Sequence, residues 1–203
     1  MKNILILVVA ILFIFAGCTP PKPVNSIANL REGIKGETTA SAKYAAFAQK
    51  AREEGFDTIA VLFDAASKAE GIHAANHTKV LEGLGEKTED FKPEFEVKTT
   101  AENLQAAIDG ESYEVSTMYV KFLEDAKAEK VEKATTSFSW ASDTEKKHAE
   151  FYKKALEAVN ARNESNLPTS YAVCPVCGNT YDNANVDEKC AFCQTGKDKF
   201  III

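Results

Sequence analysis

The chain has 203 residues, a formal net charge of −6 and 45% hydrophobic residues. This length allows one or two domains, and the composition supplies enough apolar residues for a real core. The acidic balance argues against nucleic acid as a partner, because phosphate binding needs a basic surface. A carboxylate-rich metal site would add to the same acidity.

Residues 1–17 have the pattern of a signal peptide and are not expected to belong to the fold. One lysine precedes an apolar run from Ile4 to Phe15, and two small residues come directly before Cys18. The run is short for a membrane span. The ending is similar to that of a bacterial lipoprotein signal, in which Cys18 becomes the lipidated first residue. Simple secretion and an uncleaved anchor are the alternatives.

Residues 18–25 follow as a proline-rich, extended tether. Together with the signal, the tether predicts an exported protein held by a lipid anchor. It would lie on the outer face of the cytoplasmic membrane or in the periplasm.

Two amphipathic helices are predicted next. From Ser26 to about Arg52, apolar and small residues alternate at spacings of four and three. Glu37 lies on this apolar stripe, where a buried charge is costly unless it is paired or bound to metal. The second helix is expected to start from an N-cap at Asp57, to run to about Leu84 and to end at its two glycines.

A Glu-x-x-His motif occurs twice, as Glu70 with His73 and as Glu145 with His148. Residues three apart lie on one helix face, within reach of one metal ion. Each pair could also be a chance pair on a solvated face. Two such motifs plus one Glu from each of two other helices, however, are the ligand set of carboxylate-bridged di-iron bundles. His77 continues the stripe one turn further, as a partner of the site or as a core histidine.

The second half of the chain repeats this arrangement. Residues 86–98 have no steady period and predict a long crossover, after which Thr99 and Glu102 form a capping box. A third helix then carries Glu111 inward, and the fourth carries the second Glu-x-x-His motif. Such pseudo-twofold symmetry places two metals side by side, bridged by the Glu of each motif. Glu114 breaks the symmetry as a seventh ligand candidate.

The four remaining cysteines form two C-x-x-C knuckles after a linker at residues 163–168: Cys174, Cys177, Cys190 and Cys193. In an exported chain they could form disulfides. The paired spacing is nevertheless the one that wraps four thiolates around one tetrahedral metal. The module is poor in apolar residues and should depend on its metal to fold.

From about Ser26 to the C-terminus, the chain resembles the rubrerythrin family. The resemblance rests on Gly36-Glu37 with Tyr44-x-x-Phe47-Ala48, Ala69-Glu70-Gly71-Ile72-His73-Ala74, Gly110-Glu111-Ser112-Tyr113-Glu114 through Met118-Tyr119, Glu145-Lys146-Lys147-His148-Ala149, and both cysteine knuckles. These motifs occur in the order of the family and are specific in combination.

The resemblance implies a mainly α protein: a ferritin-like four-helix bundle at residues 26–162, followed by a rubredoxin-like module at residues 163–203. Two irons would be held by Glu37, Glu70, Glu111, Glu114, Glu145 and His148. His73 would be a redox-dependent ligand that exchanges with Glu114. A third iron would occupy the four-cysteine site. Tyr113 and Tyr119 are expected near the di-iron site, as packing residues or hydrogen-bond partners.

The activity that the resemblance implies is reduction of hydrogen peroxide to water, with electrons from an external donor such as a rubredoxin or a reductase. A homodimer is also implied. Only 12 residues separate Cys177 from Cys190, so zinc is an alternative to iron in this shortened module. The alternative functions are a ferritin-like ferroxidase or iron-binding protein, and a structural helical lipoprotein with a zinc knuckle.

Overall fold

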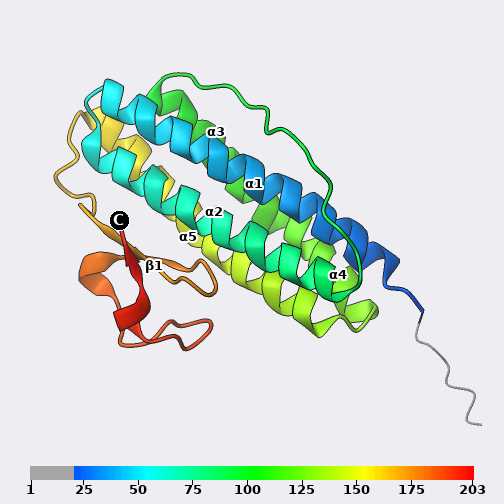
Figure 1. Cartoon of the computed structure of the whole chain (residues 1–203). Coiled ribbons are helices and arrows are strands. Elements are labelled where there is room, and N and C mark those ends of the chain that lie inside the picture. The colour runs from blue at the N-terminus through cyan, green and yellow to red at the C-terminus, as the bar shows by residue number, and fades with distance from the viewer. Residues whose placement is uncertain (1–20) are drawn as a thin grey trace, which may run out of the picture.

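The computed structural model describes residues 21–203 and shows a long helical bundle with a small β module against one side (Figure 1). The predicted signal at residues 1–17 and the predicted lipidation site, Cys18, lie outside the described residues. Among the helices of residues 21–203, none is long and apolar enough to cross a membrane.

Two helical hairpins form the bundle. Its elements are α1 (Val24–Glu53), α2 (Asp57–Gly83), α3 (Thr100–Tyr113), the π-helical turn η1 (Glu114–Met118), α4 (Tyr119–Ala128) and α5 (Glu132–Ala161). α1 packs along α2, and α3 packs along α5. The connection between the hairpins, residues 86–99, has no regular structure and runs along the length of the bundle (Figure 1). The predicted ferritin-like, mainly α fold is confirmed.

Distant glutamates set two helix starts that local signals did not predict. α1 begins at Val24, inside the predicted tether, because Glu129 accepts hydrogen bonds from the backbone N–H groups of Asn25 (3.0 Å) and Ser26 (2.7 Å). Asp57 is the first residue of α2 and not its cap. A first-turn N–H of α2, that of Ile59, donates instead to Glu164 (3.0 Å).

Two predictions that rest on signals a few residues apart, a capping box and the end of the second helix, are confirmed. Thr99 and Glu102 form the predicted capping box, in which each side chain accepts from the other residue's backbone N–H. α2 ends at Gly83, and Gly85 follows with φ of +82°, a backbone conformation that favours glycine.

The third predicted helix is interrupted by η1. A π turn inserts residues into the helical ladder and therefore changes which side chains face inward after it. Tyr119 is fully buried beyond the turn, whereas Tyr113, just before it, is 56% exposed. The expectation that Tyr113 lies near the site is therefore wrong, and the expectation for Tyr119 holds.

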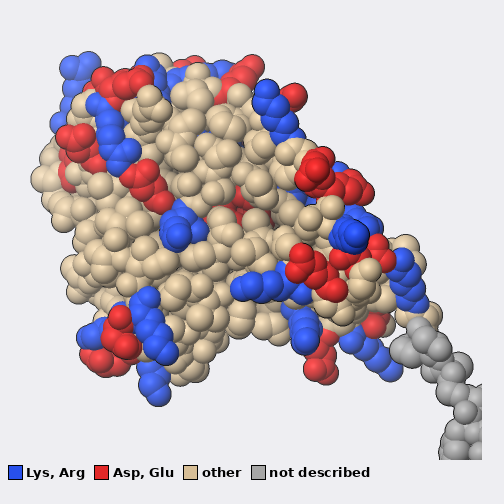
Figure 2. Space-filling view, viewed as in Figure 1, with Lys and Arg blue, Asp and Glu red and all other residues tan. Residues whose placement is uncertain are grey.

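The bundle core has two apolar halves. One half contains Tyr44, Phe63, Leu104 and Tyr152; the other contains Leu30, Leu81, Phe122 and Phe138. Between them along the helices lie the buried carboxylates and imidazoles of the predicted metal site. The surface has a different character, with acidic and basic side chains interspersed over the face drawn in Figure 2.

The C-terminal module is built on a three-stranded antiparallel sheet in the order β2–β1–β3. The strands are β1 (Tyr171–Val173), β2 (Thr180–Asp182) and β3 (Ile201–Ile202), with short 3₁₀ turns at Asn183–Asn185 and Lys197–Lys199. Tyr171 and Val173 pack into the bundle core, while Ala172 between them packs with the cysteines. Alternate residues of one short strand therefore join the module to the bundle.

Candidate metal centres

Six of the seven predicted Glu and His ligands meet in the middle of the bundle. Glu37, Glu70, Glu111, Glu145, His73 and His148 come from α1, α2, α3 and α5, and each is at most 2% exposed. They form two groups of four: Glu37, Glu70, His73 and Glu145, and Glu70, Glu111, Glu145 and His148. In each group one donor atom per residue lies within 4.8 Å of the others. Both groups contain Glu70 and Glu145.

The two imidazoles point Nδ1 at the same two carboxylates. His73 Nδ1 lies 2.9 Å from Glu70 Oε2 and 3.0 Å from Glu145 Oε1. His148 Nδ1 lies 3.1 Å from Glu70 Oε1 and 2.8 Å from Glu145 Oε2. Each shared carboxylate thus presents one oxygen to each histidine. This is the arrangement expected of two metal positions side by side with bridging carboxylates.

The donor atoms fit bound cations better than they fit one another. Within residues 21–203, Glu37 Oε2, Glu70 Oε1, both oxygens of Glu145 and His148 Nδ1 are buried without a hydrogen-bond partner. Buried polar atoms are normally satisfied, and unpaired carboxylate oxygens are among the most costly to bury. A pair of divalent metals would satisfy all of these atoms at once, so this donor set fits a di-metal centre.

Burial and the charges within the cluster shift the pKa values of its own side chains. Burial opposes the charge of Glu70, but the neighbouring imidazoles of His148 and His73 outweigh it and lower the pKa of Glu70 to about 2. Burial likewise opposes the charge of His148, and the carboxylates of Glu70 and Glu145 raise its pKa to about 9. Burial raises the pKa of Glu37 to about 8 and that of Glu111 well above its usual range. The ligands therefore divide into charged and neutral groups until a cation compensates them.

Glu114, the seventh predicted ligand, lies outside both groups. It is the first residue of η1 and is half-buried, whereas the other six are buried. Burial raises the pKa of Glu114 well above its usual range, and the charges of Glu37, Glu145 and Glu70 raise it further. Its carboxylate is therefore close enough to feel the cluster, although it is not part of it.

Glu37 and Glu111 each belong to only one of the two donor groups, and each accepts a hydrogen bond from a tyrosine. Tyr44 donates a hydrogen bond from its hydroxyl to Glu111 Oε1 (2.7 Å). Tyr119 donates to Glu37 Oε1 and lies 3.1 Å from Nε2 of His77. These contacts leave the second oxygen of each carboxylate free for a metal. Helical spacing placed His77 on the inward stripe and Tyr44 was part of a family motif, but the sequence did not show these partners.

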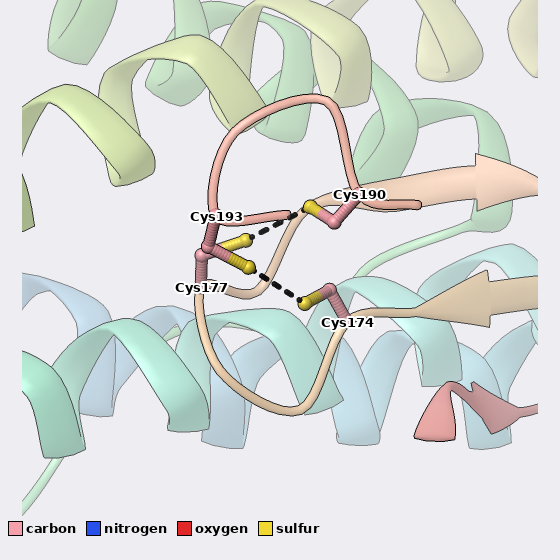
Figure 3. A group of neighbouring side chains, drawn as sticks. All are labelled: Cys174, Cys177, Cys190 and Cys193. Carbon is pink, nitrogen blue, oxygen red and sulfur yellow. Dashed lines mark hydrogen bonds between the residues drawn. The ribbon is translucent and has the colours of Figure 1, made fainter. Parts of the chain in front are cut away.

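The four cysteines of the second predicted site also come together (Figure 3). All four are free thiols, so the disulfide alternative is absent from this structure. The sulfurs of Cys174 and Cys193 lie 3.4 Å apart, as do those of Cys177 and Cys190. Four thiolates around one metal at about 2.3 Å stand at similar separations. Their arrangement fits a single tetrahedral metal ion.

Each knuckle ends in a residue with a left-handed backbone. Gly178 has φ of +81° and donates its N–H to the carbonyl of Cys174 (3.0 Å); Gln194 has φ of +63° and donates to the carbonyl of Cys190 (3.0 Å). Hydrogen bonding to Cys177 is the main cause that lowers the pKa of Cys174 to about 4. The second knuckle thus keeps its turn although it lacks the glycine of the first.

The two sites are neighbours, because the first knuckle lies against the Glu-x-x-His helices. A Cβ added to Gly178 would collide with Nε2 of His73 and lie 3.2 Å from the carbonyl of Ala69. Nε2 of His148 lies 2.9 Å from the hydroxyl of Thr180. Lys147 donates to Asn179 (2.6 Å). Sequence reasoning missed these contacts, since nothing in the local pattern marks them.

Fold and site together define a ferritin-like carboxylate metalloprotein with a second, four-cysteine metal site. The profile of the Rubrerythrin family matches residues 28–156. Rubrerythrin-2 of Clostridium acetobutylicum is 34% identical over 172 residues, which cover 84% of this chain and 92% of that protein. Nigerythrin of Nitratidesulfovibrio vulgaris is 35% identical over 184 residues, 87% of this chain and 85% of that protein. The chain belongs to the rubrerythrin family.

Solved structures agree with this assignment. A mixed-valence state of nigerythrin superposes with a TM-score of 0.78 at 34% identity and covers 88% of this chain and 86% of that one. An open-pore ferritin from Archaeoglobus fulgidus, at 14% identity and a TM-score of 0.58, shares the fold alone. The predicted cofactor types, a di-iron site and a four-cysteine iron centre, are supported by the family and by the two donor clusters.

Proposed function

We propose that this protein reduces hydrogen peroxide to water at a di-iron site that receives electrons from an iron bound by the four cysteines. The observation that carries the proposal is the pair of buried donor groups that share Glu70 and Glu145. Two ferrous ions at these positions would supply two electrons together, as cleavage of an O–O bond requires. The family supports an iron-dependent oxidoreductase.

The chain's own residues would act as ligands and positioning groups. Glu70 and Glu145, which belong to both donor groups, would be shared by the two metals. Glu37 with His73 would complete one position, and Glu111 with His148 the other. The hydroxyls of Tyr44 and Tyr119 fix the orientation of Glu111 and Glu37 through the hydrogen bonds described above. The burial of these ligands and tyrosines excludes bulk water and strengthens each of these interactions.

Glu114 and His73 would exchange with the oxidation state. Carboxylates are hard anionic donors that suit ferric iron, whereas an imidazole suits ferrous iron better. In this structure His73 belongs to the donor group that contains Glu37, and Glu114 belongs to neither group. This is the arrangement that the family resemblance assigns to the reduced site. The π turn that begins at Glu114 provides backbone that can adjust when the ligand moves.

The position of the first knuckle supports electron transfer within one chain. Gly178 directly follows Cys177 and contacts the ring of His73. Thr180 donates to the carbonyl of Gly178 (3.2 Å) and lies beside His148. Two short routes therefore lead from the cysteine site to the two histidines of the other site.

Rapid mixing of the fully reduced protein with hydrogen peroxide tests the proposal. We expect fast oxidation with one peroxide consumed per di-iron site. Slow, non-stoichiometric consumption would contradict it, and faster oxidation by dioxygen than by peroxide would favour the ferroxidase alternative. The visible bands of ferric tetrathiolate identify iron in the cysteine site; a colourless site containing zinc would contradict the electron route.

We further propose that Cys18 carries the lipid of an exported lipoprotein anchored outside the cytoplasmic membrane. The support is the pattern of residues 1–18 alone. Fractionation of cells that express the full chain tests it: the protein should be found with the membrane, and Cys18→Ser should release it.

We also propose that the protein forms a homodimer and that an external rubredoxin or reductase donates its electrons. Light scattering and reduction assays with purified donors test these two parts.

A further inference from the structure

Lys147 is a half-buried lysine of α5 that lies against the C-terminal module. Its neighbour in the second Glu-x-x-His motif, Lys146, is exposed to solvent. The ammonium group of Lys147 lies over the ring of Tyr181, 4.3 Å from the centroid, and 5.0 Å from the ring centroid of Phe192. The bundle therefore directs one of two adjacent lysines into the module that carries the four cysteines.

Two buried side chains connect this ammonium group with a cysteine sulfur. Lys147 donates to Oδ1 of Asn179 (2.6 Å), and Nδ2 of Asn179 donates to the hydroxyl of Tyr181 (2.7 Å). That hydroxyl donates in turn to Sγ of Cys190 (3.4 Å). Asn179 and Cys190 are fully buried, and Tyr181 is nearly so. The series of hydrogen bonds is therefore shielded from water and ends at a candidate metal ligand.

The chemistry of the atoms fixes the direction of each hydrogen bond. An ammonium group donates and cannot accept, so Asn179 must present its oxygen to Lys147 and its NH₂ group to Tyr181. The hydroxyl of Tyr181 also accepts from the backbone N–H of Ala191 (2.9 Å). Because both of its lone pairs are then occupied, its one hydrogen goes to Cys190. Every donor in the series points toward that sulfur.

These donors suit a metal-bound thiolate better than a free thiol. The amide of Asn179 also approaches the sulfur itself, with 3.8 Å between Nδ2 and Sγ of Cys190. The sulfur of a thiol is a weak acceptor, whereas a thiolate is charged and accepts hydrogen bonds strongly. Burying an amide and a hydroxyl is costly unless their hydrogen bonds repay it. The arrangement therefore fits a sulfur that carries negative charge.

We propose that Lys147, Asn179 and Tyr181 raise the reduction potential of an iron held by the four cysteines. This inference rests on the part of the proposed function that places iron at that site, and not on the reaction with peroxide. One electron from the external donor converts the ferric ion to the ferrous ion, and no bond forms or breaks. With four thiolates, this step takes the site from one net negative charge to two. Positive charge and hydrogen-bond donors beside the sulfurs stabilise the more negative, reduced state.

The location of the charge decides how strongly it acts. Lys146 has the same charge on the same helix, but it is exposed and pairs with Asp143 (2.7 Å), so water and salt screen it. Lys147 is half-buried and is linked to the sulfur through protein atoms, where the effective dielectric constant is lower. The two adjacent lysines therefore offer a comparison in which the charge is equal and its surroundings differ.

Redox titration of the full-length, iron-loaded protein tests the proposal, followed through the visible bands of the ferric four-cysteine site. Lys147→Met keeps the length of the side chain and removes its charge. We expect the equilibrium constant for reduction of that iron to fall about 10-fold, which is 59 mV for a one-electron couple. Lys147→Arg keeps the charge over the Tyr181 ring and should stay within about twofold of the wild type. Lys146→Met, the matched control, should also stay within about twofold.

A second variant removes the last donor and keeps the charge. Tyr181→Phe retains the ring beneath Lys147 and deletes the hydroxyl hydrogen that Cys190 accepts. We expect the equilibrium constant for reduction to fall about 3- to 10-fold. The ferric charge-transfer bands should also move to longer wavelength, because a thiolate without this hydrogen bond gives up electron density more readily. A change that affected only the stability of the module would leave the band positions where they are.

The potentials can refute this inference whether or not the protein reduces peroxide. Equal potentials in the wild type, Lys147→Met and Tyr181→Phe would overturn it and leave the proposed function standing. An equal fall in Lys146→Met and Lys147→Met would also overturn it, since net charge alone would then set the potential. If Lys147→Met fails to hold iron, Tyr181→Phe decides. A wild-type site that does not hold iron would overturn the inference as well. Potentials that shift as expected in a protein inert to peroxide would support the inference and refute the proposed function.

Discussion

His148 and Thr180 join the bundle to the C-terminal module through one hydrogen bond. Nε2 of His148 lies 2.9 Å from the hydroxyl of Thr180, while Nδ1 of the same ring faces Glu70 and Glu145. One ring nitrogen therefore points at the candidate di-iron site. The other contacts β2, the strand that follows the first cysteine knuckle. A partner on the far nitrogen fixes the tautomer and orientation of a metal-binding histidine.

Replacing Thr180 tests this coupling. Thr180→Val keeps the shape of the side chain and removes the hydroxyl, so the His148 ring loses the partner of Nε2. We expect about 10- to 100-fold weaker retention of iron at the di-iron site, measured by competition with a chelator. Thr180→Ser keeps the hydroxyl and should behave like the wild type. Equal iron loss from the Val and Ser variants would show that the hydroxyl has no such role.

Local sequence patterns were sufficient to predict the core of the site. Glu70 with His73 and Glu145 with His148 are related by helical spacing, and Glu37 interrupts an apolar stripe, so their inward placement follows from periodicity alone. The capping box at Thr99 is equally local. Contacts between distant segments could not be predicted in this way. Glu129 and Glu164 start helices far from them in sequence, and Thr180 meets a helix 32 residues earlier.

The π turn shows a second limit of sequence reasoning. A steady α-helical period through the third helix places Tyr113 near the site, but the inserted turn at Glu114–Met118 changes the register beyond it. Tyr113, which precedes the turn, is exposed, and Glu114, the first residue of the turn, lies outside both donor groups. The extra ligand candidate was visible in the sequence as a break in symmetry, whereas the backbone distortion behind it was not.

His73 should be needed for turnover and not for assembly. His73→Ala removes the ligand expected in the reduced state and leaves Glu114 available for the oxidised one. We expect normal iron content in the oxidised protein, with reduction or peroxide turnover slowed at least about 10-fold, measured by stopped-flow absorbance. His148→Ala is the comparison, and it should lose iron in both states. Loss of iron from oxidised His73→Ala would refute the exchange.

A pH dependence is expected where the first hairpin meets the second. Glu54 accepts a hydrogen bond from the backbone N–H of Thr100 (2.9 Å) at the start of α3, and it also pairs with Lys50 (3.2 Å). Partial burial opposes the charge of Glu54, but these hydrogen bonds outweigh it and lower its pKa. Since the folded pKa lies below the usual value of 4.5, the stabilisation is fully present above pH 4.5. It is lost as the pH falls through the folded pKa.

Glu54→Gln should therefore lower the free energy of unfolding by about 0.5–1 kcal/mol at neutral pH. The difference from the wild type should shrink as the pH falls below 4.5 and disappear below the folded pKa of Glu54. Thermal unfolding over a pH series measures it, with the exposed Glu53→Gln as the matched control. A difference that stays constant down to acidic pH would mean that the charge of Glu54 does not stabilise the junction.

Gly178 should be the residue that allows the module to dock. Its φ of +81° disfavours any side chain, and a Cβ would also strike the ring of His73 and approach the carbonyl of Ala69. Gly55 has φ of +82° with open space around a Cβ, so Gly55→Ala isolates the backbone cost, about 1 kcal/mol. Gly178→Ala should cost more, about 2 kcal/mol or above, and expose residues 163–203 to proteolysis. Equal destabilisation in the two variants would indicate that the knuckle does not rest against His73 in solution.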